Sequence, residues 1–212
     1  MHVEPICADH EMARPREFDE DDVLEAALQC FWARGYDKTS VKDLIDKTGL
    51  TAASLYNAFG DKRALYERAL ENYVEGSIAD RIQRCRRLAP RDAIQTFFAE
   101  VLRRSLGDRE RKGCMLINAA LEVAPHDPDF RKAVGGVLAR IEGFFLERLR
   151  AGQADGTVTR SLSAEDHARH LLGVLIGVRV LARVRPEPTL LEGAVRVALA
   201  ALERPNTKMS EL

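Results

Sequence analysis

The side chains best suited to bind a partner lie between residues 39 and 62, where hydroxyl, amide and basic groups are interspersed with small residues. Hydroxyl and amide groups can donate hydrogen bonds to phosphate oxygens, and small side chains let a short helix enter the major groove of DNA. Lys62 opens a helix, so its charge adds to a positive helix end that favours a phosphate. The predicted DNA contacts, with two arginines on an arm before the first helix, are Arg14, Arg16, Thr39, Ser40, Thr51, Ala52, Ala53, Ser54, Tyr56, Asn57 and Lys62.

The charge balance around these residues argues against tight binding by a single copy. From residue 13 to residue 63 the chain has eight Lys and Arg against ten Asp and Glu. Phosphate contacts supply much of the affinity for DNA, so this window should bind weakly by itself. We therefore expect that two subunits are required.

Capping signals place these residues on short helices. Ser40, with Asp43 three residues later, resembles a capping box, and Gly49 ends the helix that follows. Thr51 can cap a helix of barely two turns, which carries Ala52 and Ala53 at its start. Almost all of the remaining chain has a helical period. About nine helices are predicted, over 20–34, 41–48, 52–59, 62–87, 90–106, 114–123, from 128 onward, 164–184 and 189–203.

The N-terminal residues resemble the signature of the TetR family of transcriptional regulators. The similarity covers about 50 residues in one register without a gap, roughly a quarter of the chain. The residues that carry it are Phe31, Arg34, Gly35, Tyr36, Thr39, Ser40, Val41, Leu44, Ile45, Thr48, Gly49, Leu50, Thr51, Ser54, Leu55, Tyr56, Phe59, Asp61, Lys62, Leu65 and Tyr66. Family members often have a polar residue and then Gly where this chain has Ala52 and Ala53. An alanine can at most touch a thymine methyl, which weakens that part of the comparison.

The resemblance implies an all-α fold with two domains. A three-helix helix-turn-helix domain over 14–63 would bind DNA, and a helical domain over 64–206 would bind an effector and dimerise. Tails are expected over 1–13 and 207–212. Repression is the usual mode of regulation in the family.

The segment 112–122 is the most distinctive part of the second half. It resembles a stretch of NemR-type family members, in which a cysteine follows a glycine at a helix start. Cys114 would lie at a helix N-terminus near Arg111 and Lys112, which are features that raise thiolate reactivity. A buried, unreactive thiol is the open alternative.

An effector cavity and a dimer interface are implied by the resemblance, and helical periodicity suggests which residues form them. The predicted effector contacts are Phe97, Phe98, Val101, Cys114, Met115, Asn118, Phe144, Phe145 and Leu175. The last two helices have broad apolar faces, and Gly173 and Gly177 permit a close helix approach. The predicted interface residues are Leu171, Leu175, Val178, Leu181, Leu191, Val195, Leu199 and Leu202.

Composition excludes several other classes of protein. With 46% hydrophobic and 31% charged residues, the 212-residue chain is expected to fold, and no stretch reaches the ~20 apolar residues that a membrane span needs. The N-terminus does not resemble a signal peptide and the four cysteines form no C-x-x-C pair, so a cytoplasmic protein with reduced thiols is expected. No cofactor, metal site or catalytic motif is predicted, which argues against an enzyme.

These features predict a ligand-responsive, homodimeric transcriptional regulator that a small molecule releases from a palindromic DNA operator. Two alternatives stay open. One is a cysteine-based redox or electrophile sensor of the same fold. The other is a helical interaction protein whose helix-turn-helix does not bind DNA.

Overall fold

The computed structural model describes residues 18–203 and, within that range, contains helices and no β-strand, as the sequence predicts. Where both ends of a helix are predicted, they agree with the structure to within three residues. The predicted helix over 62–87 begins and ends as expected but is divided into segments. The helices are α1 (Glu20–Arg34), α2 (Val41–Thr48), α3 (Ala52–Phe59), α4 (Lys62–Tyr73), α5 (Asp80–Arg86), α6 (Pro90–Gly107), α7 (Met115–Glu122), α8 (Pro128–Asp155), α9 (Ala164–Val184) and α10 (Pro188–Ala200).

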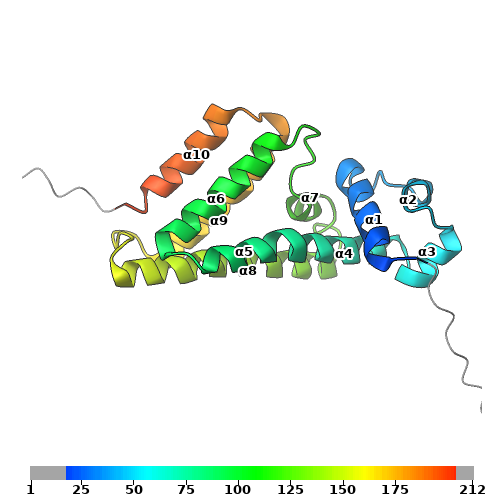
Figure 1. Cartoon of the computed structure of the whole chain (residues 1–212), viewed down its shortest axis with the longest axis horizontal. Helices are drawn as coiled ribbons and strands as arrows, with labels where there is room; N and C mark the ends of the chain where they lie inside the picture. Colours follow the sequence, from blue (N-terminus) through cyan, green and yellow to red (C-terminus); the bar gives the residue numbers. More distant parts are fainter. Residues whose placement is uncertain (1–17, 204–212) are drawn as a thin grey trace, which may run out of the picture.

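Helices α1 to α3 form a small unit at one end of the elongated molecule (Figure 1). Ser40 and Asp43 make the predicted capping box at the start of α2, and Thr51 accepts a hydrogen bond from the Ser54 N–H at 3.2 Å. Gly49 has a φ of 73°, which lets the chain turn sharply from α2 into α3. Local capping therefore fixes the helix-turn-helix geometry.

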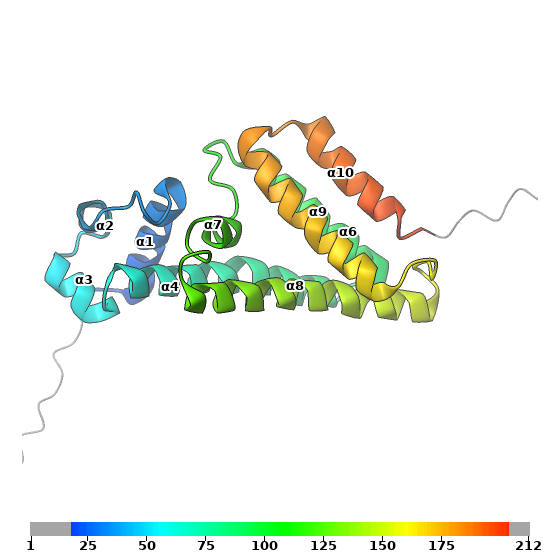
Figure 2. The same ribbon diagram turned by 180° about the vertical axis from the view of Figure 1, so that it is seen from behind.

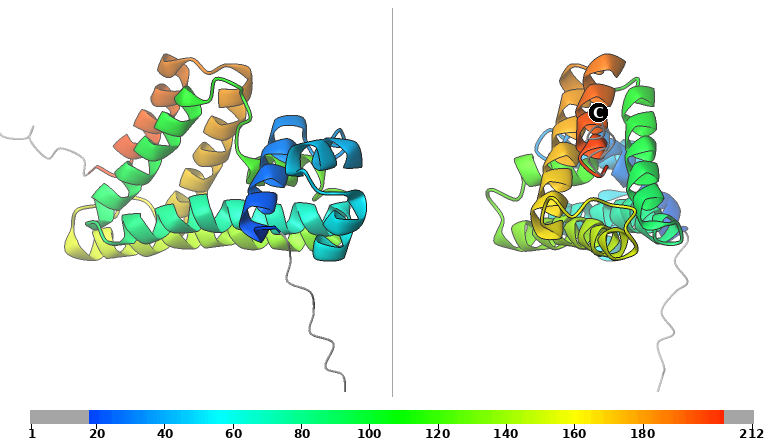
Figure 3. Two further views of the ribbon diagram at one scale, coloured as in Figure 1. Left: turned by 45° about the vertical axis from the view of Figure 1, so that its right-hand side comes forward. Right: turned by 90° about the vertical axis from the view of Figure 1, so that its left-hand side faces the viewer.

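The other helices form a layered domain. The long helix that includes α4 and α5 runs alongside α8, and α6 and α9 rise from this pair (Figures 1 and 2). Helix α10 packs on both α6 and α9 (Figure 3), while α7 lies between this group and the N-terminal unit (Figures 1 and 2). Among residues 18–203, no helix is both long and apolar enough to cross a membrane.

The long helix is continuous but not uniform. The sequence predicts one α-helix from residue 62 to about 87, whereas Val74–Ala79 forms a π-helical segment between α4 and α5. A π-helical turn re-aims the side chains beside it and is frequent at functional sites. Hydrophobic periodicity does not reveal such an insertion, so the sequence prediction missed it.

A single hydrophobic core joins the N-terminal unit to the rest of the chain. Phe31 of α1 packs edge-on against Tyr66 of α4, with ring centroids 4.9 Å apart, and Tyr66 packs against Phe130 of α8 at 5.4 Å. This row of rings places α8 in packing contact with α4, and α4 in packing contact with the helix-turn-helix unit.

Candidate DNA-binding surface and effector cavity

Helix α3 presents the start of its first turn to solvent. Thr51, Ala53 and Asn57 are exposed, whereas Leu55 is fully buried against the core. Ala52, Ser54 and Tyr56 are partly exposed along the same helix. The residues predicted to face DNA on α3 therefore lie on one accessible surface at the end of the molecule (Figure 1).

The other predicted DNA contacts differ in their surroundings. Ser40 is exposed and caps α2, and Lys62 is partly exposed with its Nζ 4.5 Å from the centroid of the Tyr36 ring. Arg14 and Arg16 lie outside the described residues. These assignments stay predictions.

Thr39 has a different position from the one predicted. Its side chain is fully buried, and its Oγ1 donates a hydrogen bond to the Gly35 carbonyl at 2.7 Å. A hydroxyl with no exposed surface cannot reach a phosphate in this conformation, so the prediction for Thr39 is revised. The sequence shows a polar residue beside a turn but does not show which group its hydroxyl meets.

We expect Thr39→Val to reduce stability and to leave the intrinsic DNA affinity of the folded protein unchanged. The substitution keeps the shape but removes a buried donor, which leaves the Gly35 carbonyl unpaired and costs about 1–3 kcal/mol. Urea unfolding measures the first effect, and fluorescence anisotropy below the unfolding transition measures the second. A large loss of DNA affinity in a fully folded variant would restore Thr39 as a DNA contact.

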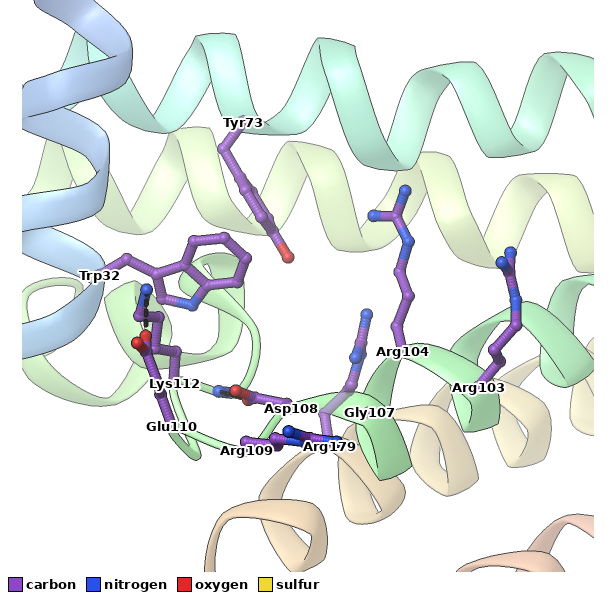
Figure 4. Close-up of a pocket in the computed structure, with 11 residues that line it drawn as sticks. Trp32, Tyr73, Arg103, Arg104, Gly107, Asp108, Arg109, Glu110, Lys112 and Arg179 are labelled. Atoms are coloured by element: carbon purple, nitrogen blue, oxygen red, sulfur yellow. Dashed lines mark hydrogen bonds and ion pairs between the residues drawn. The ribbon is translucent and has the colours of Figure 1, made fainter.

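A cavity of about 630 Å³ lies between the N-terminal unit and the C-terminal helices. Its wall combines α1, α4, the end of α6 with the loop that follows, and α9 (Figure 4). This volume is within the usual range for small-molecule sites. The lining residues are Trp32, Tyr73, Arg103, Arg104, Gly107, Asp108, Arg109, Glu110, Lys112, Gly113 and Arg179.

The loop between α6 and α7 has a constrained backbone. Arg111 and Gly113 both have positive φ, 54° and 74°, and the Gly113 N–H donates to Asp108 Oδ2 at 2.7 Å. A Cβ on Gly113 would lie only 2.6 Å from Cδ of Arg183 on α9. The loop is therefore held in one shape against α9, and Gly113 allows the close approach.

The predicted effector contacts do not line this cavity. Phe97, Phe98, Phe144 and Phe145 are fully buried and pack on one another, with the Phe98 and Phe145 rings stacked at 5.6 Å. The remaining predicted contacts, Val101, Cys114, Met115, Asn118 and Leu175, are also buried. Helical spacing identified an inward face but could not separate the core from a cavity wall.

Cys114 and Asn118 lie directly behind the cavity wall. The Tyr73 hydroxyl donates to Cys114 Sγ at 3.5 Å, and Arg183 Nη1 donates to Asn118 Oδ1 at 2.9 Å. Cys114 precedes the first residue of α7, as predicted, but its thiol is buried. Its role as a reactive sensor stays a prediction.

The residues that do line the cavity are not among the predicted effector contacts. Arg179 carried a usable signal, because it interrupts the apolar stretch from Leu171 to Ala182. Trp32 and Tyr73 come from helices distant in sequence, so no local spacing could join them.

Polar contacts hold the N-terminal unit and the start of α4 against the segment from α7 to α8. The Tyr36 N–H donates to Glu122 Oε2 at 3.2 Å, and Arg63 binds Asp127 through Nε at 2.6 Å and Nη2 at 3.0 Å. These hydrogen bonds lower the pKa of Asp127 to about 2, so its carboxylate is ionised at neutral pH. The bidentate pair fixes the angle between α4 and the start of α8.

The predicted dimer residues divide into two groups. Leu181 and Leu199 are partly exposed, but the other six are buried within a single chain. Those six, Leu171, Leu175, Val178, Leu191, Val195 and Leu202, therefore form core rather than surface, and the prediction is revised for them. An apolar stripe shows that a face is covered but not by which chain.

The exposed apolar residues of α9 and α10 lie at other positions. Val180, Val184 and Val197 are exposed, and Val197 retains 73% of its accessible surface. A Cβ added to Gly173 or Gly177 would meet nothing within 4 Å. We call these five residues the α9–α10 surface, which is apolar and partly or largely exposed in the described chain.

Two family models match the chain. The model for bacterial regulatory proteins of the tetR family matches residues 23–69, and the model for the tetracyclin repressor-like C-terminal domain matches residues 90–198. The first covers α2, α3 and most of α1 and α4, and the second covers most of the cavity-bearing domain.

Individual proteins are similar over most of their length. The uncharacterised regulator YezE of Bacillus subtilis is 33% identical over 91% of this chain and all of its own, and the repressor ComR of Escherichia coli is 27% identical over 91% of both chains. A cysteine mutant of the regulator CifR, solved with 26-base-pair operator DNA, is 31% identical with a TM-score of 0.79, covering 90% of this chain and all of that one.

The structure of reduced NemR from Escherichia coli has the same fold. It is 20% identical, with a TM-score of 0.76, and the match covers 88% of this chain and 98% of that one. YezE, ComR and CifR are all transcriptional regulators.

Proposed function

Because this chain belongs to the TetR family of DNA-binding transcriptional regulators, we propose that it is a homodimeric repressor, released from a palindromic operator by a small molecule. The observation that carries the proposal is the exposed start of α3, capped by Thr51 and placed at the tip of a helix-turn-helix. This geometry suits a recognition helix that enters the major groove. A cytoplasmic location is part of the proposal, since the partner is chromosomal DNA.

The dimer is proposed to form through the α9–α10 surface. A two-fold interface pairs the same surface of both subunits, and exposed valines beside open glycine positions suit close helix contact. Two α3 helices related by this axis would reach half-sites about 34–36 Å apart, or a related spacing. One N-terminal unit has more acidic than basic residues and should bind DNA weakly. Simultaneous binding at two half-sites compensates for this weak binding.

Effector binding is proposed to alter the spacing of the two α3 helices. Trp32 belongs to α1 and also lines the cavity, so a ligand there touches the DNA-binding unit directly. Lys112, from the opposite wall, donates to Gln29 of α1 at 3.2 Å. A ligand that binds more tightly when α1 and the α6–α7 loop are further apart would favour this separated arrangement. The two α3 helices of the dimer would then have a spacing that does not fit the operator.

A genomic pull-down with the purified full-length protein tests this function. Enriched fragments would be titrated by fluorescence anisotropy at two salt concentrations. We expect a palindromic site whose affinity falls steeply as salt rises. A folded dimer that enriches no fragment, even after unfolding and refolding to remove bound ligand, would contradict the proposal.

We expect Tyr56→Ala and Lys62→Ala to weaken binding to all DNA sequences alike. Each residue is predicted to contact a phosphate. Lys62→Ala should lower the salt slope by about 2, because a dimer loses two cationic contacts, whereas Tyr56→Ala removes a neutral donor and should lower affinity with little change in the slope. Arg87→Ala is the matched control, since Arg87 is exposed at the far end of α5. Unchanged affinity for Tyr56→Ala, or an unchanged salt slope for Lys62→Ala, would remove that residue from the contact surface.

A further inference from the structure

The cavity between α1 and α9 has an unbalanced charge. Five basic side chains line it, from Arg103, Arg104, Arg109, Lys112 and Arg179, against two acidic ones. One of the acidic residues, Glu110, forms an ion pair with Lys112, and the other, Asp108, already accepts the Gly113 N–H. The arginines are therefore left without a carboxylate partner among residues 18–203.

Arg179 is the most constrained of these cations. It lies on α9 with only 7% of its surface exposed, and its described hydrogen bond is from Nη1 to the neutral Ser105 hydroxyl at 3.1 Å. A buried guanidinium is normally paired with an anion, because burial removes it from water. Within the described chain, Arg179 has no such anion.

A second buried arginine makes the charge imbalance larger. Arg81 is buried, which lowers the pKa of its guanidinium. The positive charges of Arg179 and Arg104 lower this pKa further. Glu100 binds Arg81 at 3.2 Å but also binds Arg84 through both of its oxygens. Glu100 is thus shared between two arginines and leaves no negative charge for Arg104 or Arg179.

Neutral donors face the same space. The Trp32 Nε1 is buried and has no acceptor among the described residues. The Tyr73 hydroxyl points between Trp32 and Arg104 in Figure 4, and its only described acceptor is a thiol, which is a weak one. The guanidinium groups of Arg104 and Arg179 point toward this region as well (Figure 4). The cavity therefore offers many donors and few free acceptors.

We propose that this cavity binds a small organic anion, a carboxylate or phosphate ester, whose charged group lies between Arg104 and Arg179 and whose planar apolar body lies against Trp32 and Tyr73. Arginine matches the oxygens of carboxylates and phosphates with paired hydrogen bonds. The Trp32 and Tyr73 rings pack edge to face, 5.1 Å apart at 69°, and both line the cavity, so they give the apolar body an aromatic surface to contact. The identification of this anion as the effector rests on the proposed function, but anion binding itself does not.

Trp32 makes the binding directly measurable, because it is the only tryptophan in the chain and it lines the cavity. The full-length dimer, without DNA, would be titrated with benzoate, phenyl phosphate, inorganic phosphate and benzamide at constant ionic strength. Tryptophan emission and thermal midpoint are recorded together. We expect benzoate and phenyl phosphate to change both, with phenyl phosphate binding more tightly than inorganic phosphate, and benzamide to change neither.

Variants separate a specific site from general charge effects. Arg104→Gln, at an exposed position, should weaken binding of the two aromatic anions by about 10- to 100-fold, the usual range for one charge-assisted contact. Arg179→Gln should do the same and should raise the thermal midpoint of the free protein, because it removes an unpaired buried charge. Arg87→Gln, far from the cavity, should behave as wild type.

Three results would overturn the proposal. They are an equal response to benzamide, unchanged anion affinity in Arg104→Gln, or no response to any of the anions up to about 50 mM, which would saturate a millimolar site. Operator affinity measured with and without phenyl phosphate tests the effector role separately. Binding without any change in operator affinity would support the anion site and reject its regulatory role.

Discussion

Val197→Asp should convert the protein from a dimer to a monomer and remove most of its operator affinity. Val197 is largely exposed on α10, the outermost helix of the C-terminal domain, so the change costs a single chain little (Figure 1). In a two-fold interface the carboxylate would be introduced on both subunits and lose its water against apolar surface. Loss of simultaneous two-site binding should reduce operator affinity by at least about 100-fold.

Sedimentation velocity and fluorescence anisotropy on the same sample measure these two effects. Leu121→Asp is the control, because Leu121 is also an exposed apolar residue but lies on α7, outside the α9–α10 surface. It should remain dimeric and bind the operator normally. If Val197→Asp stays dimeric with unchanged affinity, the subunits associate through a different surface.

Helix ends were predictable because their causes are local. Ser163 caps α9 by accepting the Asp166 N–H at 3.0 Å, and both residues are three positions apart in the sequence. The turn at Gly49 likewise depends on a single residue that tolerates positive φ. The helix-turn-helix and its exposed α3 follow from such short-range rules, so their position in the fold was predictable, while the DNA contacts themselves stay predictions.

The cavity was not predictable, since its wall depends on long-range packing. Trp32, Tyr73, Arg104 and Arg179 are each about 30 to 75 positions from the next along the chain, and their convergence requires the complete arrangement of α1, α4, α6 and α9. Periodicity shows that a side chain faces inward but not what covers it. For the same reason, buried residues on and beside α9 and α10 were predicted to form the dimer interface, whereas the exposed valines lie at other positions.

The position of the cavity gives the proposed regulation a short physical route. Trp32 is one helix turn from Gln29, and α1 is packed against α4 through Phe31 and Tyr66. A ligand that moves Trp32 therefore moves a core helix of the DNA-binding unit rather than acting through a distant relay. The Arg63–Asp127 pair and the Tyr36–Glu122 hydrogen bond would resist that movement, so in the proposed mechanism they add to the binding energy that a ligand must supply.

Phe98→Ala should reduce the free energy of unfolding by about 3–5 kcal/mol, the usual cost of truncating a fully enclosed aromatic ring. Phe98 has no exposed surface and contacts the rings of Phe97 and Phe145, so its removal leaves a void that the neighbouring rings cannot fill. If Phe98 instead lined an effector cavity, truncation would enlarge an existing space at much lower cost and change ligand affinity directly.

Urea unfolding at fixed protein concentration distinguishes these two roles, because the dimer couples stability to concentration. Leu121→Ala is the control and should change the unfolding free energy by no more than about 0.5 kcal/mol, since that side chain is mostly exposed. A loss below about 1 kcal/mol for Phe98→Ala would mean that the aromatic cluster borders open space rather than closed core. The expected large loss would leave the arginine-lined cavity beside Trp32 as the site where an effector can enter without disrupting the core.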